Sequence, residues 1–509
     1  MNYISIEFFV ILFVSILFYY FLGFLNRKFK KVKIPQWSVL LISSLVFYGF
    51  TNYFYLIYLF VSCFIVWIIS IFVQNQVIFY GGTDIKTEYI ENRMYRRRYE
   101  NTLTALAIII NVSILGVLKY YNFFSSSVNS LFNTNLPIYK FIIPLGISFY
   151  TFTLISYSVE TRKRNIIAEK NIFKFFLYIS YFPKILQGPI STYDRISDDR
   201  LYKEHKFTDI KFLNSFYRFT TGVVKKVIIA NIAGLYVDKI FANYTEISSL
   251  LLIIGAILYS IQLYCDFSGF IDMSIGISGF FGVSLEENFN VPYLSKSIKE
   301  FWRRWHITLG AWLKKYIYIP LGGNRVGKIR FIINTIIVWL VSGIWHGANW
   351  TFVIWGLYYG ALLSLNNLCS PLLSSLVHKF KINTKNTVYK SLMIIKTFVL
   401  VTFGWIIFRS SSMNQAIGYI KNIISFKNNN SLNIFSEITL PDIFLIISLV
   451  SFVILILINC LKVIKFNNKN IIPTMKYIYV CIFLMVAIVY TIYSYSNGGG
   501  ESSFIYFDF

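Results

Sequence analysis

Apolar runs long enough to cross a bilayer recur along this chain, and they limit its fold more than any other feature. Examples are 4–25, 103–120, 443–461 and 477–495. About 20 apolar helical residues span the hydrocarbon core of a membrane. Only 14% of the residues are charged, which is too few to cover a water-soluble body of this size. We therefore predict an all-α, polytopic transmembrane helical bundle that forms a single domain over 1–509.

Basic residues gather in the connections between apolar runs. Blocks at 27–33, 93–98 and 162–164 follow the first, third and fifth expected crossings. Positively charged connections stay on the cytoplasmic side, so we expect an external N-terminus and cytoplasmic basic loops. The net charge of +25 then reflects this bias and attraction to anionic lipid headgroups. We expect membrane lipids, and not nucleic acid, as its partners.

The stretch from 172 to 363 has a different character. Its apolar runs contain the charged residues Lys184, Lys225 and Lys226. They are also interrupted by proline and glycine, namely Pro183, Pro189, Gly222, Gly269, Gly276, Pro292, Pro320, Gly322 and Gly323. Non-helical backbone at membrane depth persists only where protein or water satisfies it. We expect broken or re-entrant helices that line a cavity, and charged residues there point to function.

Two of the four histidines lie in apolar or Trp-rich sequence. His346 stands in Trp-His-Gly-Ala-Asn-Trp between two apolar runs, where a buried imidazole must be hydrogen-bonded or used. Its ordinary pKa near 6.5 suits a general base, although a histidine that bonds a neighbouring helix fits the same pattern. Asn349 in this motif is a substrate-binding candidate. The five cysteines are scattered and match no metal-binding pattern, so we expect no metal.

His306 closes the segment Phe-Trp-Arg-Arg-Trp-His at 301–306. The guanidiniums of Arg303 and Arg304 can hold phosphate groups through forked hydrogen bonds, or the segment can anchor the chain at headgroup level. Asp266 and Asp272 are carboxylates in an apolar stretch, and each needs a partner. One of these arginines is a candidate partner, and both carboxylates can be purely structural. Asp266, like Arg303 and Arg304, is a substrate-binding candidate.

The last residues, 498–509, form three glycines followed by a strongly aromatic tail. Exposed apolar patches are usually occupied, so the tail either lies on the bilayer or packs between helices, or it inserts into the protein's own cavity. Tyr506 is its only phenol. A phenol can accept an acyl group in covalent catalysis.

The motifs between 264 and 360 together resemble the membrane-bound O-acyltransferases of bacteria, in the branch that O-acetylates alginate and peptidoglycan. They are Asp-Phe-Ser-Gly at 266–269, Asn-Val-Pro-Tyr at 290–293, 301–306, Tyr-Ile-Pro-Leu-Gly-Gly-Asn-Arg at 318–325, and Trp-His-Gly-Ala at 345–348. The resemblance implies a ring of helices around a central funnel in the bacterial plasma membrane. It also implies a catalytic His346 and an important His306. The tail resembles a terminal motif whose tyrosine, here Tyr506, is proposed to carry the acyl group.

This resemblance implies a function and its partners. No bound cofactor is expected. The resemblance implies that an acyl donor, acetyl-coenzyme A or another acyl thioester, supplies the group from the cytoplasm. It also implies that an extracytoplasmic esterase-like acyltransferase passes the group to a cell-surface glycan. Two departures, Lys314-Lys315 where relatives often carry Arg-Asp and Asp508 where Gln is common, leave the details of donor and acceptor open.

Two other functions fit parts of the sequence. D-alanyl transfer to teichoic acid uses a similar tail on a separate small protein, whereas this chain carries the tail itself. A transporter or channel would also show broken helices and buried charges, but a pore has no need of paired histidine motifs.

Overall fold

The computed structural model describes residues 3–29, 34–79, 86–426, 440–463, 471–496 and 504–505. Within these ranges the chain is helical, and its extended pairing is limited to an isolated antiparallel bridge between Phe289 and Trp305. The predicted all-α, multi-pass architecture is confirmed.

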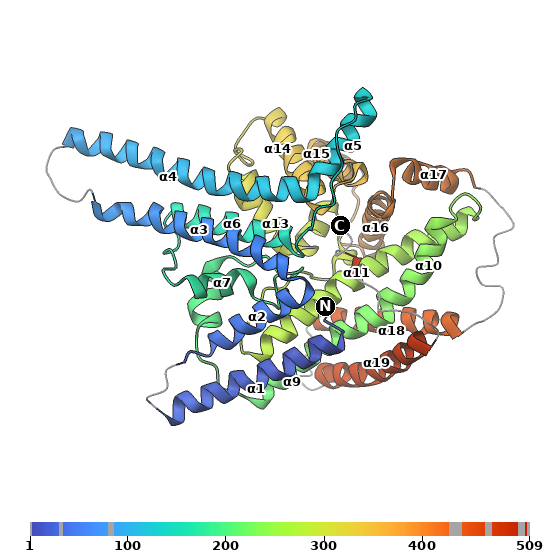
Figure 1. The fold of residues 1–509 in the computed structure, drawn as a ribbon. Helices are drawn as coiled ribbons and strands as arrows, with labels where there is room; N and C mark the ends of the chain where they lie inside the picture. Colours follow the sequence, from blue (N-terminus) through green and yellow to red (C-terminus); the bar gives the residue numbers. More distant parts are fainter. Residues whose placement is uncertain are drawn as a thin grey trace. The chain divides into compact units, whose positions relative to one another are not determined.

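Eight helical segments of the described chain are long and apolar enough to cross a membrane (Figure 1). They are α1 (Ile6–Lys28), α3 (Tyr53–Phe79), the run of α4 (Lys86–Leu115), η1 (Gly116–Tyr120) and α5 (Tyr121–Phe132), the run of α9 (Asp209–Val224), η3 (Lys225–Ala230) and α10 (Asn231–Ala242), then α11 (Ser249–Phe280), α14 (Lys328–His346), α15 (Trp350–Lys379) and α16 (Thr387–Arg409). Shorter apolar stretches lie in α2 (Trp37–Thr51), α18 (Leu440–Val463) and α19 (Ile471–Ser496).

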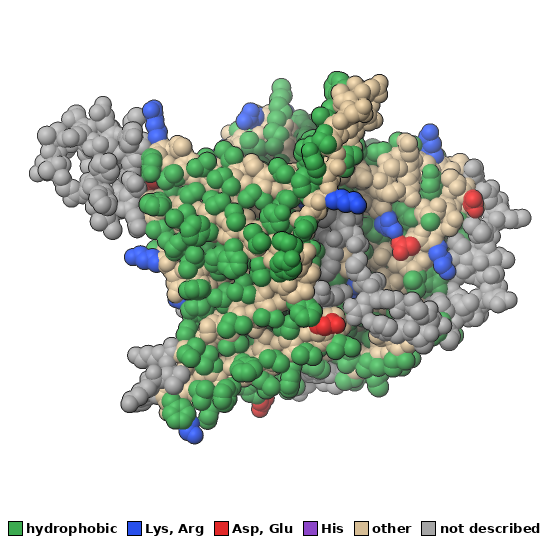
Figure 2. Space-filling model, viewed as in Figure 1, with side chains coloured by type: hydrophobic (Ala, Val, Ile, Leu, Met, Phe, Trp, Pro, Cys, Tyr) green, Lys and Arg blue, Asp and Glu red, His purple; other side chains and the backbone are tan. Residues whose placement is uncertain are grey.

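The outer faces of these helices are apolar. Hydrophobic side chains cover the visible face of α1 to α4 almost continuously (Figure 2). On α1, for example, Phe13 is 64% exposed and Phe21 is 56% exposed. Apolar patches of this extent in water would drive association, so these faces contact lipid.

The described helices fall into two compact units, 1–216 with 274–286, and 217–273 with 287–509. The first unit also contains α6 (Ile147–Arg162), α7 (Ile172–Ser180), α8 (Tyr193–Ile196) and η2 (Ser197–Leu201). The second also contains η4 (Pro292–Leu294), α12 (Ile298–Arg304), α13 (Ile307–Leu313), η5 (Lys314–Tyr318) and α17 (Met413–Ile424).

In the first unit, the apolar run 141–159 before the basic block at 162–164 becomes helical only at Ile147. Pro144 cannot continue a helix from its N-terminal side, and Gly146 adopts φ +72° just before α6. A side chain at Gly146 would also meet the carbonyl oxygen of Ile185 at 2.2 Å. The apolar run therefore divides into irregular chain and a buried helix.

The structure corrects our interpretation of three glycines in 172–363. Gly222, Gly269 and Gly276 do not interrupt helices but lie inside α9 and α11. A Cβ on Gly222 would come within 2.5 Å of the Gly269 carbonyl oxygen, so Gly222 and Gly269 let two helix backbones touch. Small residues serve this purpose in membrane bundles, where close van der Waals packing drives helix association. The predicted breaks do occur at 181–192 and 319–327, which are not helical and contain Pro183, Pro189, Pro320, Gly322 and Gly323. Pro292 begins the short turn η4, and the α-helical path is also interrupted by the π-helical turns η3 and η5.

Helices α14 and α15 form a hairpin with the same device. A Cβ on Gly343 of α14 would lie 2.3 Å from the Phe352 carbonyl oxygen, and one on Gly356 of α15 would lie 2.4 Å from the Trp339 carbonyl oxygen. Because backbone stands on the far side of each contact, neither neighbour can rotate away. The hairpin places the loop after α14 at a fixed distance from α15.

We predict that Gly343→Ala lowers the melting temperature of the purified protein in detergent, because overpacking a rigid contact costs roughly 1–3 kcal/mol. Gly116→Ala is the matched control, since a Cβ there meets nothing within 4 Å. Equal melting temperatures for the two variants would contradict the close approach of α14 and α15.

Candidate active site

His346 is the last residue of α14, and the chain then turns through Gly347 into α15. Its imidazole is 4% exposed and is surrounded by aromatic rings. The ring centroids of Trp345, Trp355 and Phe408 lie 4.9, 5.1 and 5.4 Å from that of His346. The close hairpin therefore holds this histidine in an apolar, largely dry environment.

His306 lies between α12 and α13 in the left-handed region of backbone space, at φ +45°. A non-glycine residue in this conformation is uncommon and must be held by its surroundings. The hold comes from a neighbouring strand of chain. The Asn290 amide donates to the Arg304 carbonyl (2.9 Å), and the Ile307 amide donates to the Asn288 carbonyl (3.0 Å).

Asn288 also sets the state of the His306 imidazole. Its side-chain oxygen accepts the Thr308 amide at 2.9 Å and lies 3.4 Å from His306 Nδ1. Because an amide oxygen can only accept, Nδ1 carries the proton and Nε2 keeps its lone pair. His306 is 2% exposed, and its Nε2 has no hydrogen-bond partner among the residues that the structure describes. Burial lowers the pKa of His306 to about 3, so this imidazole is neutral near pH 7.

The two histidine motifs meet at Trp345. The indole ring of Trp345 lies 5.9 Å from the His306 ring and 4.9 Å from the His346 ring, measured between centroids. A dense group of aromatic rings surrounds this contact, made by Trp302, Trp305, Trp339, Trp355, Trp405, Tyr359 and Phe408. Segments distant in sequence thus build one site with two buried imidazoles.

The other predicted binding residues lie on the same elements. Asn349 is the N-cap of α15; its side-chain oxygen accepts the Thr351 amide (3.0 Å) and its amide donates to the Ser411 carbonyl (3.0 Å). Arg304 pairs with Glu300 at 2.8 Å, and Arg303 is exposed. Substrate binding by these three residues stays a prediction.

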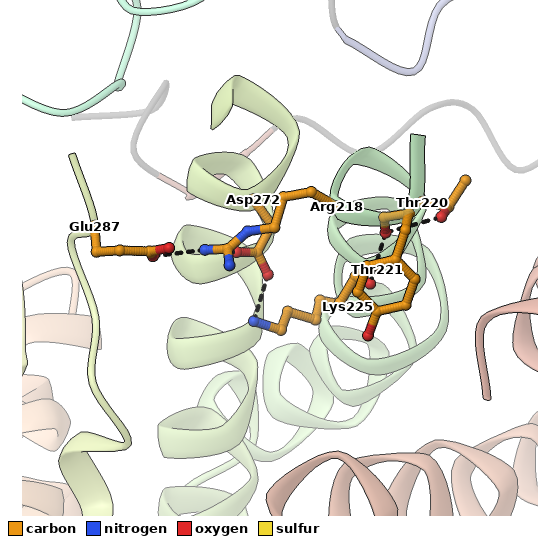
Figure 3. A network of polar contacts seen from close by, with 7 residues as sticks. Arg218, Thr220, Thr221, Lys225, Asp272 and Glu287 are labelled. Carbon is orange, nitrogen blue, oxygen red and sulfur yellow. Dashed lines mark hydrogen bonds and ion pairs between the residues drawn. The ribbon is translucent and has the colours of Figure 1, made fainter. Parts of the chain in front are cut away.

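Asp272 of α11 is the centre of a polar network whose cations come from α9 and η3 (Figure 3). Lys225 Nζ lies 2.6 Å from one carboxylate oxygen of Asp272, and Arg218 Nη2 lies 2.7 Å from the other. Arg218 also reaches Glu287 at 2.6 Å. The proposed partnership of Asp272 with Arg303 or Arg304 is therefore wrong.

Asp266, the other carboxylate of α11, pairs with Lys226 at 2.7 Å; here too the partner is neither arginine. Both side chains are buried, at 1% and 2% exposure. The second oxygen of Asp266 accepts the backbone N–H of Ile505 at 3.0 Å. Phe504 and Ile505 therefore pack against α11 and η3 in the second unit, as predicted for a tail that packs between helices. Tyr506, the next residue, lies outside the described residues.

Sequence reasoning noticed Lys225 and Lys226 but missed Arg218 and Asn288. Two adjacent cations in one apolar run, followed by two carboxylates in the next, are a signal that could have identified these ion pairs. Asn288 gave no such signal, because its role depends on the chain pairing of 288–290 with 304–307.

The described residues contain no group of three or more His, Cys, Asp or Glu side chains arranged to hold a metal ion.

The sequence of this chain is similar to known proteins over most of its length. The family model described as the membrane-bound O-acyltransferase family matches residues 107–405. A peptidoglycan O-acetyltransferase of Helicobacter pylori is 33% identical over 82% of this chain and 80% of its own length. A probable alginate O-acetylase AlgI of Pseudomonas syringae is 38% identical over 61% of this chain and 58% of its own length. A teichoic acid D-alanyltransferase of Bacillus subtilis is 28% identical over 59% of this chain and 76% of its own length.

We predict that replacing His306 by Gln changes the pH dependence of stability. The pKa of His306 is about 3 in the folded protein and near 6.5 when unfolded, so the unfolded chain binds more protons between these values. The contribution of the neutral, buried His306 to the free energy of unfolding is therefore fully present above pH 6.5 and is lost as the pH falls toward 3.

Thermal or denaturant unfolding in detergent at several pH values measures this difference. Below pH 6.5 the wild-type free energy of unfolding falls faster than that of His306→Gln, by up to about 1.4 kcal/mol per pH unit. Parallel curves for the two proteins would show that His306 is not held neutral by burial.

Proposed function

Because the chain belongs to the membrane-bound O-acyltransferase family, we propose that it transfers an acetyl group from a cytoplasmic donor for O-acetylation of a cell-surface polysaccharide. The observation that carries this proposal is the meeting of His306 and His346 at Trp345 in buried aromatic surroundings. The relatives named as a peptidoglycan O-acetyltransferase and a probable alginate O-acetylase support acetyl as the group and a polysaccharide as the acceptor.

The proposed first step is acetylation of the tail. His346 takes the proton of the Tyr506 hydroxyl as its oxygen bonds to the carbonyl carbon of the acetyl thioester. The carbon–sulfur bond breaks, and coenzyme A leaves as a thiol with a proton returned from the imidazolium. A base positioned in this way contributes about 10²–10⁴-fold to rate.

His306 supports this step as a second, neutral imidazole. Its Nε2 lone pair can accept a proton, while Asn288 orients the ring through Nδ1. The exposed Arg303, together with Arg304 and Asn349, contributes to donor binding, since guanidinium groups recognise the phosphates of coenzyme A.

The second step is transfer from the acetylated tyrosine to the glycan. A sugar hydroxyl attacks the tyrosyl ester, which restores the phenol and forms the O-acetyl sugar. We assign this step to an extracytoplasmic esterase-like acyltransferase partner. The lipid bilayer separates the two half-reactions.

D-alanyl transfer is the alternative that one comparison favours, through the teichoic acid D-alanyltransferase match. That match has lower identity, at 28%, than the 33% of the peptidoglycan relative and the 38% of the alginate relative. The acid that mild base releases from the cell-surface polymers distinguishes acetate from D-alanine.

We predict that His346→Ala and Tyr506→Phe each lower ester-linked acetate on the cell-surface polymers about 10²-fold or more, since each removes a group that takes part in the transfer. The measurement is acetate released by mild base from cells that express equal amounts of each variant.

His378→Ala is the matched control, because His378 is exposed near the end of α15. We expect this variant to keep the wild-type ester content. Full ester content in His346→Ala would exclude the proposed base, and a transporter function would then explain the chain better. Released D-alanine in place of acetate would replace the proposed acyl group.

A further inference from the structure

The described end of the tail, Phe504 and Ile505, is held by residues of η3 and α11. Phe504 is fully buried, and its ring lies perpendicular to that of Phe270 with centroids 5.1 Å apart. Lys226 Nζ lies 4.4 Å from the Phe504 ring centroid, a cation–π distance. The Ile505 amide donates to Asp266 at 3.0 Å.

The Lys226–Asp266 ion pair also contacts the described end of the tail. One oxygen of Asp266 faces Lys226 at 2.7 Å, and its other oxygen accepts from the tail. A buried ion pair is favourable only when its remaining lone pairs and protons are also satisfied. The tail satisfies one carboxylate oxygen with its backbone and covers the ammonium group with an aromatic face.

The position of this pair connects it to the histidine site. Phe267, the residue that follows Asp266 on α11, packs its ring against His306 with centroids 4.7 Å apart.

We propose that Asp266 and Lys226 are positioning residues that bind the C-terminal tail through an aromatic ring at 504 and a main-chain N–H at 505, and so present the next residue for acylation. This proposal rests on the proposed function, because it assumes that Tyr506 is the acceptor. Because the tail carries the acyl acceptor, Asp266 would be a substrate-binding residue through its bond to the tail. The recognised group at 505 is the backbone, so the side chain there matters less than its N–H.

The test replaces Ile505 by proline, which has no N–H, and by valine, which keeps it. Both are made in a protein with Phe504→p-azidophenylalanine, which keeps an aromatic ring at 504. After illumination of the membranes, mass spectrometry measures the cross-linked adduct between 504 and the peptide that contains Phe270. Ester-linked acetate on the cell-surface polymers is measured in cells that express the same Ile505 variants with the natural Phe504.

We expect the adduct with wild-type Ile505 and with Ile505→Val, and at least a tenfold loss of adduct and of acetate with Ile505→Pro. The charge-balanced pair Asp266→Leu with Lys226→Met, which removes both partners without leaving a lone buried charge, gives the same loss. Tyr506→Phe loses acetate but keeps the adduct.

Three results would each contradict a different part of the proposal. Undiminished adduct in Ile505→Pro would show that the Asp266 hydrogen bond does not hold the tail. Lost adduct with normal acetate would show that holding the tail does not position the acceptor. Normal acetate in Tyr506→Phe with the adduct intact would reject the acyl-tyrosine function and leave the tail anchor standing.

Discussion

Charges buried in an apolar interior must be paired, and this constraint organises the second unit. An unpaired ammonium or carboxylate at such depth costs several kcal/mol. Asp266 and Asp272 stand six residues apart on α11, or about 9 Å along its axis. Their partners Lys226 and Lys225 are adjacent in η3. Satisfying both pairs at once fixes η3 against α11 and sets the register of the two elements.

Packing then fixes what the charges have aligned. Glycines at the crossing of α9 with α11, and of α14 with α15, let backbones approach until a single methyl group would not fit. Lipid chains offer no hydrophobic advantage over a neighbouring helix, so close contact supplies the attraction. The α14–α15 hairpin delivers His346 to the aromatic cluster, and the strained backbone at His306 delivers the second imidazole.

Helix α11 of this multi-pass acyltransferase carries a carboxylate of a buried charge pair and contacts both the described end of the tail and the histidine site. Asp266 contacts the tail directly, and its neighbour Phe267 contacts His306. The same helix, α11, therefore touches the two residues before the proposed acceptor and the proposed catalytic region. An acyltransferase needs its acceptor and base in fixed register, since positioned groups replace a slow encounter in solution.

The sequence by itself determined the helical, multi-pass architecture, because hydrophobic length and low charge leave a chain few alternatives in a membrane. It also identified both histidine motifs and the aromatic tail. Only the tertiary structure decided the partners of Asp266 and Asp272, the late start of α6, and the role of Asn288. These depend on contacts between segments far apart in the chain. Local sequence records that a buried charge needs a partner, but the choice of partner follows from which helices pack together.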